Sequence, residues 1–363
     1  MKNILVFFGG ASPEREVSVI TGTLVSNSFD RAGFNPVPVY VDARGRWFTG
    51  EPLFNVDNFK NLPEKKLKSV VLFTDGTLYA VKGKKIKPVC RADGVINCMH
   101  GGAGEDGCFS GIFKACGLPV ASPGVAPSAA AMDKELTKYV LKGLKIPCLP
   151  FFCVKSVQEL PEIPPFGYPV IVKPARGGSS IGIRRADDAE TLDDCVKYAL
   201  KFGEKAIVEP FVQDFTEINC AGYRDKSGEI VLSPCERPVK SADILSFSDK
   251  YEGGTHVFPA DIDVKLSEKI RKITRTVYEK LGFDGIVRAD FIVTGGKPYL
   301  NEINSVPGSL AYYLFCDTLK QFSALLTELV AAAEEKSATE RAYVTRYDSG
   351  ILSGIGSKGV KRR

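Results

Sequence analysis

The sequence is poor in the residues and segments that mark several classes of protein. Of its 363 residues only His100 and His256 are histidine, and its ten cysteines include no Cys-x-x-Cys pair. A histidine-rich zinc site is therefore not expected, and the cysteines are best interpreted as buried, reduced thiols. No apolar run approaches the roughly 18 residues of a membrane span, and the run at 4–8 is too short for a signal peptide. The sequence predicts a cytoplasmic protein with no membrane partner.

A strong excess of one charge sign is also missing from the body of the chain. The formal net charge is +5, but four of the cationic residues lie in the last six positions, namely Lys358, Lys361, Arg362 and Arg363. The rest of the chain therefore has a net charge of about +1. A nucleic-acid surface would need a basic stripe over a folded face. We therefore expect no nucleic-acid partner. Residues 336–363, rich in Gly, Ser and Lys, are interpreted as a mobile basic tail.

What is present is ordinary globular composition, with 44% hydrophobic and 25% charged residues, and a length that predicts two or three domains. The apolar run 4–8 predicts a strand, and helical spacing over 15–30 follows two glycines, as in the opening of an α/β fold. Asp75-Gly76 predicts a hairpin turn between two further strands.

Four helices are predicted farther along the chain, and one of them, 189–202, lies between two predicted strands, 169–173 and 206–209. Another covers 132–144 and is broken by the prolines after it, and a last one covers 323–335. Between them, Ser267 is expected to be the N-cap of a helix that Gly282 closes.

Two predicted strands, 285–293 and 299–304, could carry a metal site. If the glycine connection between them is a three-residue loop, Asp290 lies opposite Glu302 and Arg288 lies opposite Asn304, whereas a two-residue loop would place these groups on opposite faces. Two carboxylates and an amide oxygen form a site suited to Mg²⁺, and Arg288 beside it would stabilise developing negative charge. The alternative is an ordinary surface hairpin.

A second candidate for chemistry is the glycine-serine loop 177–182, which follows the strand that ends at Lys173. Its backbone N–H groups could approach phosphates closely, but a flexible loop is the alternative. It is not a Walker A loop, and Gly9-Gly10 does not complete a dinucleotide fingerprint. Lys134 is a candidate phosphate ligand or an exposed helix lysine.

Taken jointly, the motifs resemble those of the D-alanine-D-alanine ligases of the ATP-grasp superfamily. The resemblance covers residues 9–308. It rests on the opening Gly9-Gly10-Ala11-Ser12-Pro13-Glu14-Arg15-Glu16-Val17-Ser18, the block His100-Gly101-Gly102-Ala103-Gly104-Glu105-Asp106-Gly107, Met132-Asp133-Lys134, Val170-Ile171-Val172-Lys173-Pro174, Gly285-x-x-Arg288-x-Asp290, and Glu302-Ile303-Asn304-Ser305-Val306-Pro307-Gly308.

The resemblance implies a mixed α/β and α+β fold with the three-domain ATP-grasp architecture. Residues 1–122 would form an N-terminal α/β substrate domain with a parallel sheet, the pre-ATP-grasp domain. Residues 123–212 would form the central ATP-grasp lobe, and residues 213–335 the C-terminal lobe with the metal site. A homodimer is also implied.

The resemblance further assigns site residues. ATP would be bound by Lys134, Lys173, Gly178, Ser179, Ser180, Glu209, Pro210, Phe211, Val212 and Glu217. Two Mg²⁺ ions, or Mn²⁺ in their place, would be bound by Asp290, Glu302 and Asn304. The catalytic residues would be Glu14, Ser179, Tyr251 and Arg288. The D-alanine substrates would be contacted by Glu14, His100, Lys250, Tyr251, Gly308, Ser309 and Leu310.

The implied activity is that of an ATP-dependent carboxylate-amine ligase that joins two D-alanines through an acylphosphate to give D-alanyl-D-alanine, ADP and phosphate for peptidoglycan synthesis. The chain departs from the family after Pro307-Gly308, where Ser309-Leu310 follows at once as a shortened form of the acceptor contact. Tyr251 favours an amino acid acceptor over a hydroxy acid. The alternatives are the same chemistry with another acceptor, such as D-serine, and a non-catalytic nucleotide-binding relative.

Overall fold

The computed structural model describes residues 1–239 and 256–355, together with 357 and 359. Lys250 and Tyr251, predicted as site residues, lie outside this range. Over the described residues, none of the helices is both long and apolar enough to cross a membrane. All ten cysteines are free thiols, and six are buried, as expected, whereas Cys108 is exposed.

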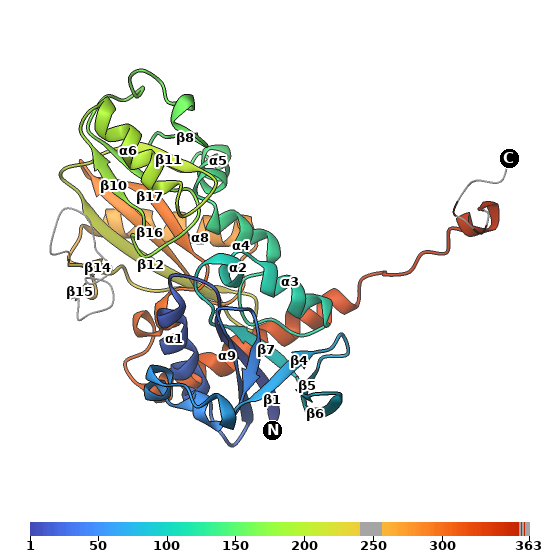
Figure 1. Ribbon diagram of the computed structural model, residues 1–363. Helices are drawn as coiled ribbons and strands as arrows, with labels where there is room; N and C mark the ends of the chain where they lie inside the picture. The colour runs from blue at the N-terminus through green and yellow to red at the C-terminus, as the bar shows by residue number, and fades with distance from the viewer. Residues whose placement is uncertain (240–255, 356, 358, 360–363) are drawn as a thin grey trace.

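The N-terminal lobe is built on a seven-stranded sheet of order β6-β5-β4-β3-β2-β1-β7 (Figure 1). The strands are β1 (Lys2–Gly9), β2 (Phe34–Val41), β3 (Trp47–Thr49), β4 (Lys68–Leu72), β5 (Thr77–Lys82), β6 (Lys85–Arg91) and β7 (Gly94–Asn97). Strand β1 pairs in parallel with β2 and β7, while β3 to β6 extend the sheet antiparallel. The expected parallel sheet is therefore mixed, and the Asp75-Gly76 hairpin is confirmed between β4 and β5.

The apolar run of β1 is continuous because both faces of the sheet are covered. Ile4, Val6 and Phe8 pack on the side of helix α1 (Arg15–Ser28). Leu5 and Phe7 pack on the opposite side, in the same cluster as a residue of α3 (Cys108–Ala115). This strand lies at the centre of the lobe. The loop that follows its carboxyl end carries Glu14, and α1 begins at the next residue.

The central lobe is an antiparallel sheet of order β10-β9-β11-β8, with helix α6 packed on one face. Its elements are β8 (Phe152–Val154), β9 (Val170–Pro174), β10 (Arg184–Ala186), α6 (Ala189–Ala199) and β11 (Ala206–Pro210). The predicted strands 169–173 and 206–209 and the predicted helix 189–202 are confirmed within a few residues as β9, β11 and α6, whereas β8 and β10 were not predicted.

The C-terminal lobe is an antiparallel sheet of order β13-β12-β16-β17. Its elements are β12 (Thr216–Arg224), β13 (Ile230–Leu232), α8 (Val264–Leu281), β16 (Val287–Thr294) and β17 (Lys297–Asn304). Helix α8 ends at left-handed Gly282 as predicted, but its N-cap is Asp263, whose carboxylate accepts from the N–H groups of Lys265 and Leu266. The Ser267 prediction was wrong because Asp263 offers an equally good cap one turn earlier.

The predicted helix 132–144 is confirmed as α5 (Lys134–Gly143), and a helix that was not predicted, α4 (Val125–Met132), precedes it. Asp133 is extended between them and caps α5 with its side chain. Ala131 of α4 and Leu141 of α5 pack in the same core as α8 and the C-terminal sheet. These helices therefore belong by packing to the C-terminal lobe, although the chain enters the central lobe directly after them.

The last long helix, α9 (Leu319–Arg341), is longer than the predicted 323–335, so residues 336–341 are helical and the tail begins later. Its residues Phe322, Leu326 and Val330 share a core with β1 and α1. Helix α9 thus returns to the N-terminal lobe, and the described residues after it extend away from the three lobes (Figure 1).

The remaining described elements are short. They are η1 (Glu51–Phe54), η2 (Val56–Lys60), η3 (Glu64–Lys66), α2 (Gly102–Glu105), η4 (Val157–Glu159), β14 (Arg237–Pro238), β15 (His256–Val257), η5 (Gly308–Leu314) and η6 (Ile351–Gly354).

Candidate active site

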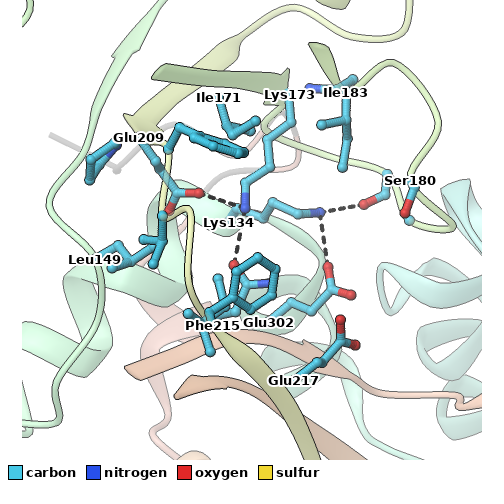
Figure 2. A pocket seen from close by; sticks show the side chains of 18 of the residues that line it. Lys134, Leu149, Ile171, Lys173, Ser180, Ile183, Glu209, Phe215, Glu217 and Glu302 are labelled. Carbon is cyan, nitrogen blue, oxygen red and sulfur yellow. Dashed lines mark hydrogen bonds and ion pairs between the residues drawn. The ribbon is translucent and has the colours of Figure 1, made fainter. Parts of the chain in front are cut away.

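A pocket lies between the central lobe and the sheet of the C-terminal lobe, with walls from β9 and β11 on one side and β17 on the other (Figure 2). Nine of the ten predicted ATP-binding residues line it: Lys134, Lys173, Gly178, Ser180, Glu209, Pro210, Phe211, Val212 and Glu217. The tenth, Ser179, lines an adjoining pocket. The structure therefore brings these residues together, as the sequence predicts.

Lys134 is buried at the first position of α5, so it is not an exposed helix lysine. Its ammonium donates to the carbonyl of Gly177 and lies 3.8 Å from a Glu302 carboxylate oxygen. Burial lowers the pKa of Lys134, and nearby Lys173 adds to that effect while Glu302 opposes it. The side chain thus links the glycine loop to β17 across the pocket.

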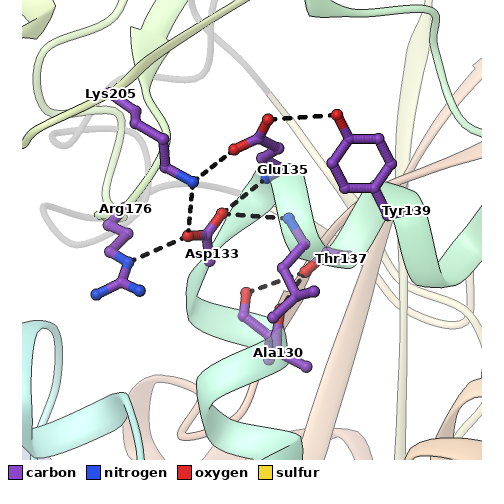
Figure 3. A network of polar contacts seen from close by, with 9 residues as sticks. Ala130, Asp133, Glu135, Thr137, Tyr139, Arg176 and Lys205 are labelled. Carbon is purple, nitrogen blue, oxygen red and sulfur yellow. Dashed lines mark hydrogen bonds and ion pairs between the residues drawn. The ribbon is translucent and has the colours of Figure 1, made fainter. Parts of the chain in front are cut away.

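The backbone at Lys134 is fixed by a polar network around Asp133 (Figure 3). The Asp133 carboxylate accepts from Arg176 at 3.2 Å and from Lys205 at 3.1 Å, in addition to the helix N–H groups that it caps. Burial would raise the pKa of Asp133, but these donors outweigh it and the pKa is lowered. An ionised N-cap of this kind holds α5 against the start of the glycine loop.

Glu209 is clamped by two buried lysines. Its carboxylate lies 2.6 Å from the Lys173 ammonium and also pairs with Lys138, a lysine that is 0% exposed. Burial would raise the pKa of Glu209, but Lys173 and Lys138 together hold it below its usual value. Lys173 also donates to the amide oxygen of Asn301 at 3.1 Å, so one lysine joins β9, β11 and β17.

The β16-β17 hairpin places the predicted metal-binding residues on one face, by a route that differs from the prediction. Thr294 pairs with Lys297, so the turn has two residues and not three. A bulge next to Asp290 shifts the register by one, and Asp290 then faces Glu302 while Arg288 faces Asn304. The predicted pairs are confirmed, but the loop length used to predict them was wrong.

Asp290 is the centre of this cluster and is buried. Arg288 donates to its two oxygens at 2.7 and 2.8 Å, and Asn304 donates to one of them at 2.9 Å. Burial would lower the pKa of Arg288, but Asp290 raises it well above its usual value, so the guanidinium is a permanent cation. Among the described residues no three His, Cys, Asp or Glu side chains cluster as a metal site. The candidate set here contains two carboxylates and an amide.

The adjoining pocket is polar, and Glu14 lies in its wall with Ser179 and Arg288. Ser179 donates a hydrogen bond to Glu14 from the tip of the glycine loop, where Ser179 and Ser180 both have left-handed backbones. A Cβ on Gly178 would lie 2.9 Å from a Glu14 oxygen, so only glycine allows this approach without displacement. The loop therefore reaches from the pocket between the lobes to Glu14.

Glu105 is a second carboxylate in this wall. It accepts from the N–H groups of Gly101 at 2.9 Å and Val306 at 3.2 Å. Burial and, after it, the charge of Glu14 raise its pKa to about 7. Its two backbone donors oppose this rise, since they stabilise the ionised carboxylate.

His100 is buried at the same pocket, and its ring nitrogen Nε2 lies 3.0 Å from the hydroxyl of Thr21. Burial, with the nearby charge of Arg288, lowers its pKa to about 3, so the imidazole is neutral. The Thr21 hydroxyl also accepts from the N–H of Ser309 at 2.9 Å. The Thr21 hydroxyl therefore joins the His100 ring to the backbone at Ser309.

The predicted acceptor segment has an unusual backbone. Ser309, Leu310 and Ala311 have φ values of 51, 53 and 45°, a left-handed turn without glycine that costs roughly 1–2 kcal/mol per residue. Leu310 is buried in the N-terminal core, so its side chain does not line the pocket, while Gly308 does. Burial of Leu310 and Leu314 in that core offsets part of the strain.

Four residues of the site were not predicted: Thr21, Lys138, Glu105 and Asn301. Glu105 lies inside a motif that carries the resemblance, and its spacing from His100 was a usable signal. Lys138 follows Lys134 by one helical turn and could have been placed on the same face. Asn301 reaches the pocket only because of the bulge, and nothing in the sequence marks a bulge there.

Comparison with known families agrees with this architecture. The family model described as the N-terminus of D-ala D-ala ligase matches residues 3–123, and that described as the C-terminus matches residues 140–332. The chain is 34% identical to the D-alanine-D-alanine ligase of Thermosipho melanesiensis, over 97% of this chain and 98% of that one. It is 32% identical to that of Chlorobium limicola, over 92% and 97%.

Solved structures give the same result. The D-alanine-D-alanine ligase of Helicobacter pylori superposes with a TM-score of 0.77 and 28% identity, covering 92% of this chain and 98% of that one. The VanG D-Ala:D-Ser ligase of Enterococcus faecalis has a TM-score of 0.75 and 26% identity, covering 92% and 99%. The likeness extends over all three lobes described above.

Proposed function

The chain belongs to the D-alanine-D-alanine ligase family, and on that premise we propose which of its residues carry the reaction. The enzyme joins two D-alanines in an ATP-dependent reaction that supplies D-alanyl-D-alanine for peptidoglycan synthesis. Its fold is the three-domain ATP-grasp architecture. The roles that follow rest on the geometry of the two pockets.

ATP would bind in the pocket between the lobes. Its phosphates would meet Lys134 and Lys173, and its base and ribose would lie along Glu209, Phe211 and the strands that carry them. The lysines are balanced by acids in the structure, with Lys173 on Glu209 and Lys134 near Glu302. Phosphate oxygens would become additional partners of these lysines.

Two Mg²⁺ ions would be held by Asp290, Glu302 and Asn304. The donor chemistry fits, because these oxygen ligands lie on one face of the hairpin next to Lys134, where the phosphates would end. Bound Mg²⁺ would neutralise charge on the transferred phosphoryl group. Mn²⁺ has the same preference for such ligands.

The first D-alanine would bind in the adjoining polar pocket with its ammonium on Glu14. Glu14 suits this role, since its carboxylate lines that pocket and Ser179 orients it by a hydrogen bond. Transfer of the γ-phosphoryl group to the D-alanine carboxylate gives an acylphosphate, since a carboxylate itself is a poor acyl donor. The neutral amine of the second D-alanine then attacks the acyl carbon, the peptide C–N bond forms as the C–O bond to phosphate breaks, and inorganic phosphate and a proton leave.

Arg288 would stabilise the oxyanion that forms in this attack. It lines the polar pocket and, as a permanent cation, needs no proton rearrangement. A single preorganised donor of this kind contributes on the order of 3 kcal/mol to transition-state binding. Gly308 lines this pocket, and its backbone would contact the second substrate together with that of Ser309 beside it. The His100 imidazole, held by Thr21, would contact the first.

The observation that carries these assignments is that Glu14, Ser179, Arg288 and Glu302, from three different lobes, line one pocket. The test is to incubate the purified chain with ATP, Mg²⁺ and D-alanine and to measure dipeptide and phosphate together. Equal amounts of both are expected. Phosphate release without dipeptide would contradict the ligase assignment, and faster turnover with D-serine as the second substrate would contradict the acceptor.

We also propose that the enzyme is a cytoplasmic homodimer. The cytoplasm supplies ATP, and the family resemblance implies the dimer. Light scattering on the purified protein would test the oligomeric state, and a monomer mass at micromolar concentration would refute it.

A further inference from the structure

Lys205 lies directly before β11 and reaches across to the first turn of α5 (Figure 3). Its ammonium is 3.1 Å from a carboxylate oxygen of Asp133 and 2.5 Å from one of Glu135. The side chain is 17% exposed, and Lys205 lines neither of the two pockets described above. Burial would lower the pKa of Lys205, but Glu135 and Asp133 raise it above its usual value. Lys205 is therefore a cation held between two acids, outside the proposed nucleotide site.

The ion pairs of Lys205 cross the boundary between two lobes. Helix α5 packs in the core of the C-terminal lobe through Leu141, whereas β11 is a strand of the central sheet. The buried pair between Lys138 of α5 and Glu209 of β11 joins the same two elements, with the lysine on the helix this time. Helix and strand are thus tied at two points, and the pocket proposed for ATP lies between the lobes to which they belong.

The backbone at the same place leads directly to Lys134. The Lys134 N–H donates to the carbonyl of Ala175 at 2.8 Å, and the Ala175 N–H donates to the carbonyl of Lys205 at 2.9 Å. The Lys134 ammonium in turn donates to the carbonyl of Gly177, two residues after Ala175. A shift of α5 relative to Lys205 would therefore displace Lys134 from the contacts at both of its ends.

Arg176 is a second cation on Asp133, and its hold is the weaker of the two. Its side chain is 53% exposed, and exposed ion pairs contribute little because water screens them. Lys205 is more buried and binds Glu135 in addition to Asp133. Lys205 therefore supplies the larger part of the attraction that holds the start of α5 against β11.

We propose that Lys205 is a positioning residue that, by tying α5 to β11, holds Lys134 where the phosphates of ATP bind. The proposal rests on the function proposed above for Lys134 and for the pocket between the lobes. It implies that Lys205 determines the affinity for the phosphate groups and leaves the affinity for the nucleoside unchanged. A residue with only a packing role would instead weaken the binding of both parts of ATP.

The test measures, by calorimetry, the binding of adenosine and of a non-hydrolysable ATP analogue with Mg²⁺ to wild type and to Lys205→Met. Methionine removes the charge and keeps much of the side-chain length. We expect the dissociation constant of the analogue to rise about tenfold, the loss typical of one hydrogen bond between charged groups. That of adenosine should stay within about twofold. Unchanged affinity for the analogue would overturn the proposal, as would an equal loss of affinity for adenosine.

Three more variants complete the test. Lys205→Arg can keep both carboxylate contacts and should bind the analogue within about threefold of wild type. Glu135→Gln removes one contact from the helix side and should show a smaller loss, again for the analogue alone, even if Lys205→Met does not fold. Lys197→Met is the matched control, because Lys197 pairs with Asp194 on its own helix in the central lobe. An equal loss in Lys197→Met, or no loss in Glu135→Gln, would overturn the proposal.

These measurements separate the proposal from the proposed function, because they use no amino acid and no turnover. A wild-type enzyme that binds the ATP analogue but makes no dipeptide would contradict the ligase role, while the comparison at Lys205 would still hold. Unchanged analogue binding in Lys205→Met, together with dipeptide synthesis by the wild type, would overturn the positioning role alone.

Discussion

Replacing Lys138 by methionine tests the charge balance beneath the nucleotide pocket. Methionine fills a similar volume but leaves Glu209, which is buried between Lys138 and Lys173, with one cation in place of two. Loss of a partner from a buried ion pair typically costs 3–5 kcal/mol. Since Lys173 stays 2.6 Å from Glu209, we expect the low end of that range, about 3 kcal/mol of unfolding free energy.

The effect should depend on pH in a defined direction. Lys173 and Lys138 lower the pKa of Glu209 in the folded state despite its burial. The stability from that shift is fully present above the usual glutamate value of 4.5 and is lost as pH falls through the lowered folded-state value. The difference between wild type and Lys138→Met should therefore be largest near neutral pH and shrink below about pH 4.5.

Urea unfolding followed by circular dichroism and fluorescence measures this difference, provided that the two transitions coincide. Lys142→Met, on the exposed side of the same helix, is the control and should change stability by no more than about 1 kcal/mol. In a double-mutant cycle with Glu209→Gln, the coupling energy should exceed about 1 kcal/mol. A coupling near zero, or a difference that does not change with pH, would refute the reasoning.

Three further predictions concern the polar pocket. Thr21→Val removes the hydroxyl that accepts a hydrogen bond from the Ser309 N–H, so the free energy of unfolding should fall by about 1–3 kcal/mol. The KM for the second D-alanine should also rise, and an unchanged KM in steady-state assays would contradict this. The raised pKa of Glu105 means that the folded state binds this proton more tightly than the unfolded state does. The free energy of unfolding of the wild type should therefore decrease as pH rises from 4.5 to about 7. Denaturation curves of Glu105→Gln should show a smaller decrease over the same range. Asp290→Asn should abolish activity and also lower the thermal midpoint, because Arg288 is left buried without its anion; an active variant in the coupled assay would remove Asp290 from the site.

The sequence predicts best where local pattern and tertiary packing agree. Strand β1 was found because a run of five apolar residues fits only a strand buried on both faces. The N-cap of α8 and the length of α9 were missed because the deciding contacts lie elsewhere. Asp263 and Ser267 are both acceptable caps, and α9 continues to Arg341, with Lys336 pairing with Asp284 and Arg341 reaching the carbonyl of Gly117.

The partners of the buried charges could not be predicted for a related reason. A lysine in an amphipathic helix is exposed in most proteins, and only the position of β11 decides that Lys138 meets Glu209. Glu105 lies within a motif that carries the family resemblance, but its hydrogen bond from Val306 joins residues about 200 positions apart in the chain. Motifs identify which residues are chemically capable, whereas tertiary structure decides which of them share a proton or a charge.

The hairpin that carries Asp290 and Glu302 gives the clearest case of compensation. A two-residue turn alone would have placed these carboxylates on opposite faces, because a shift of one residue inverts a strand. The bulge next to Asp290 adds the missing residue and brings Asn301 into the pocket beside Glu302, where it accepts from Lys173. A bulge places two neighbouring residues opposite one, and here this gives the site both an acid and an amide from a single strand. The same irregularity that defeats a prediction from loop length therefore supplies one of the contacts that hold the two lobes together at the site.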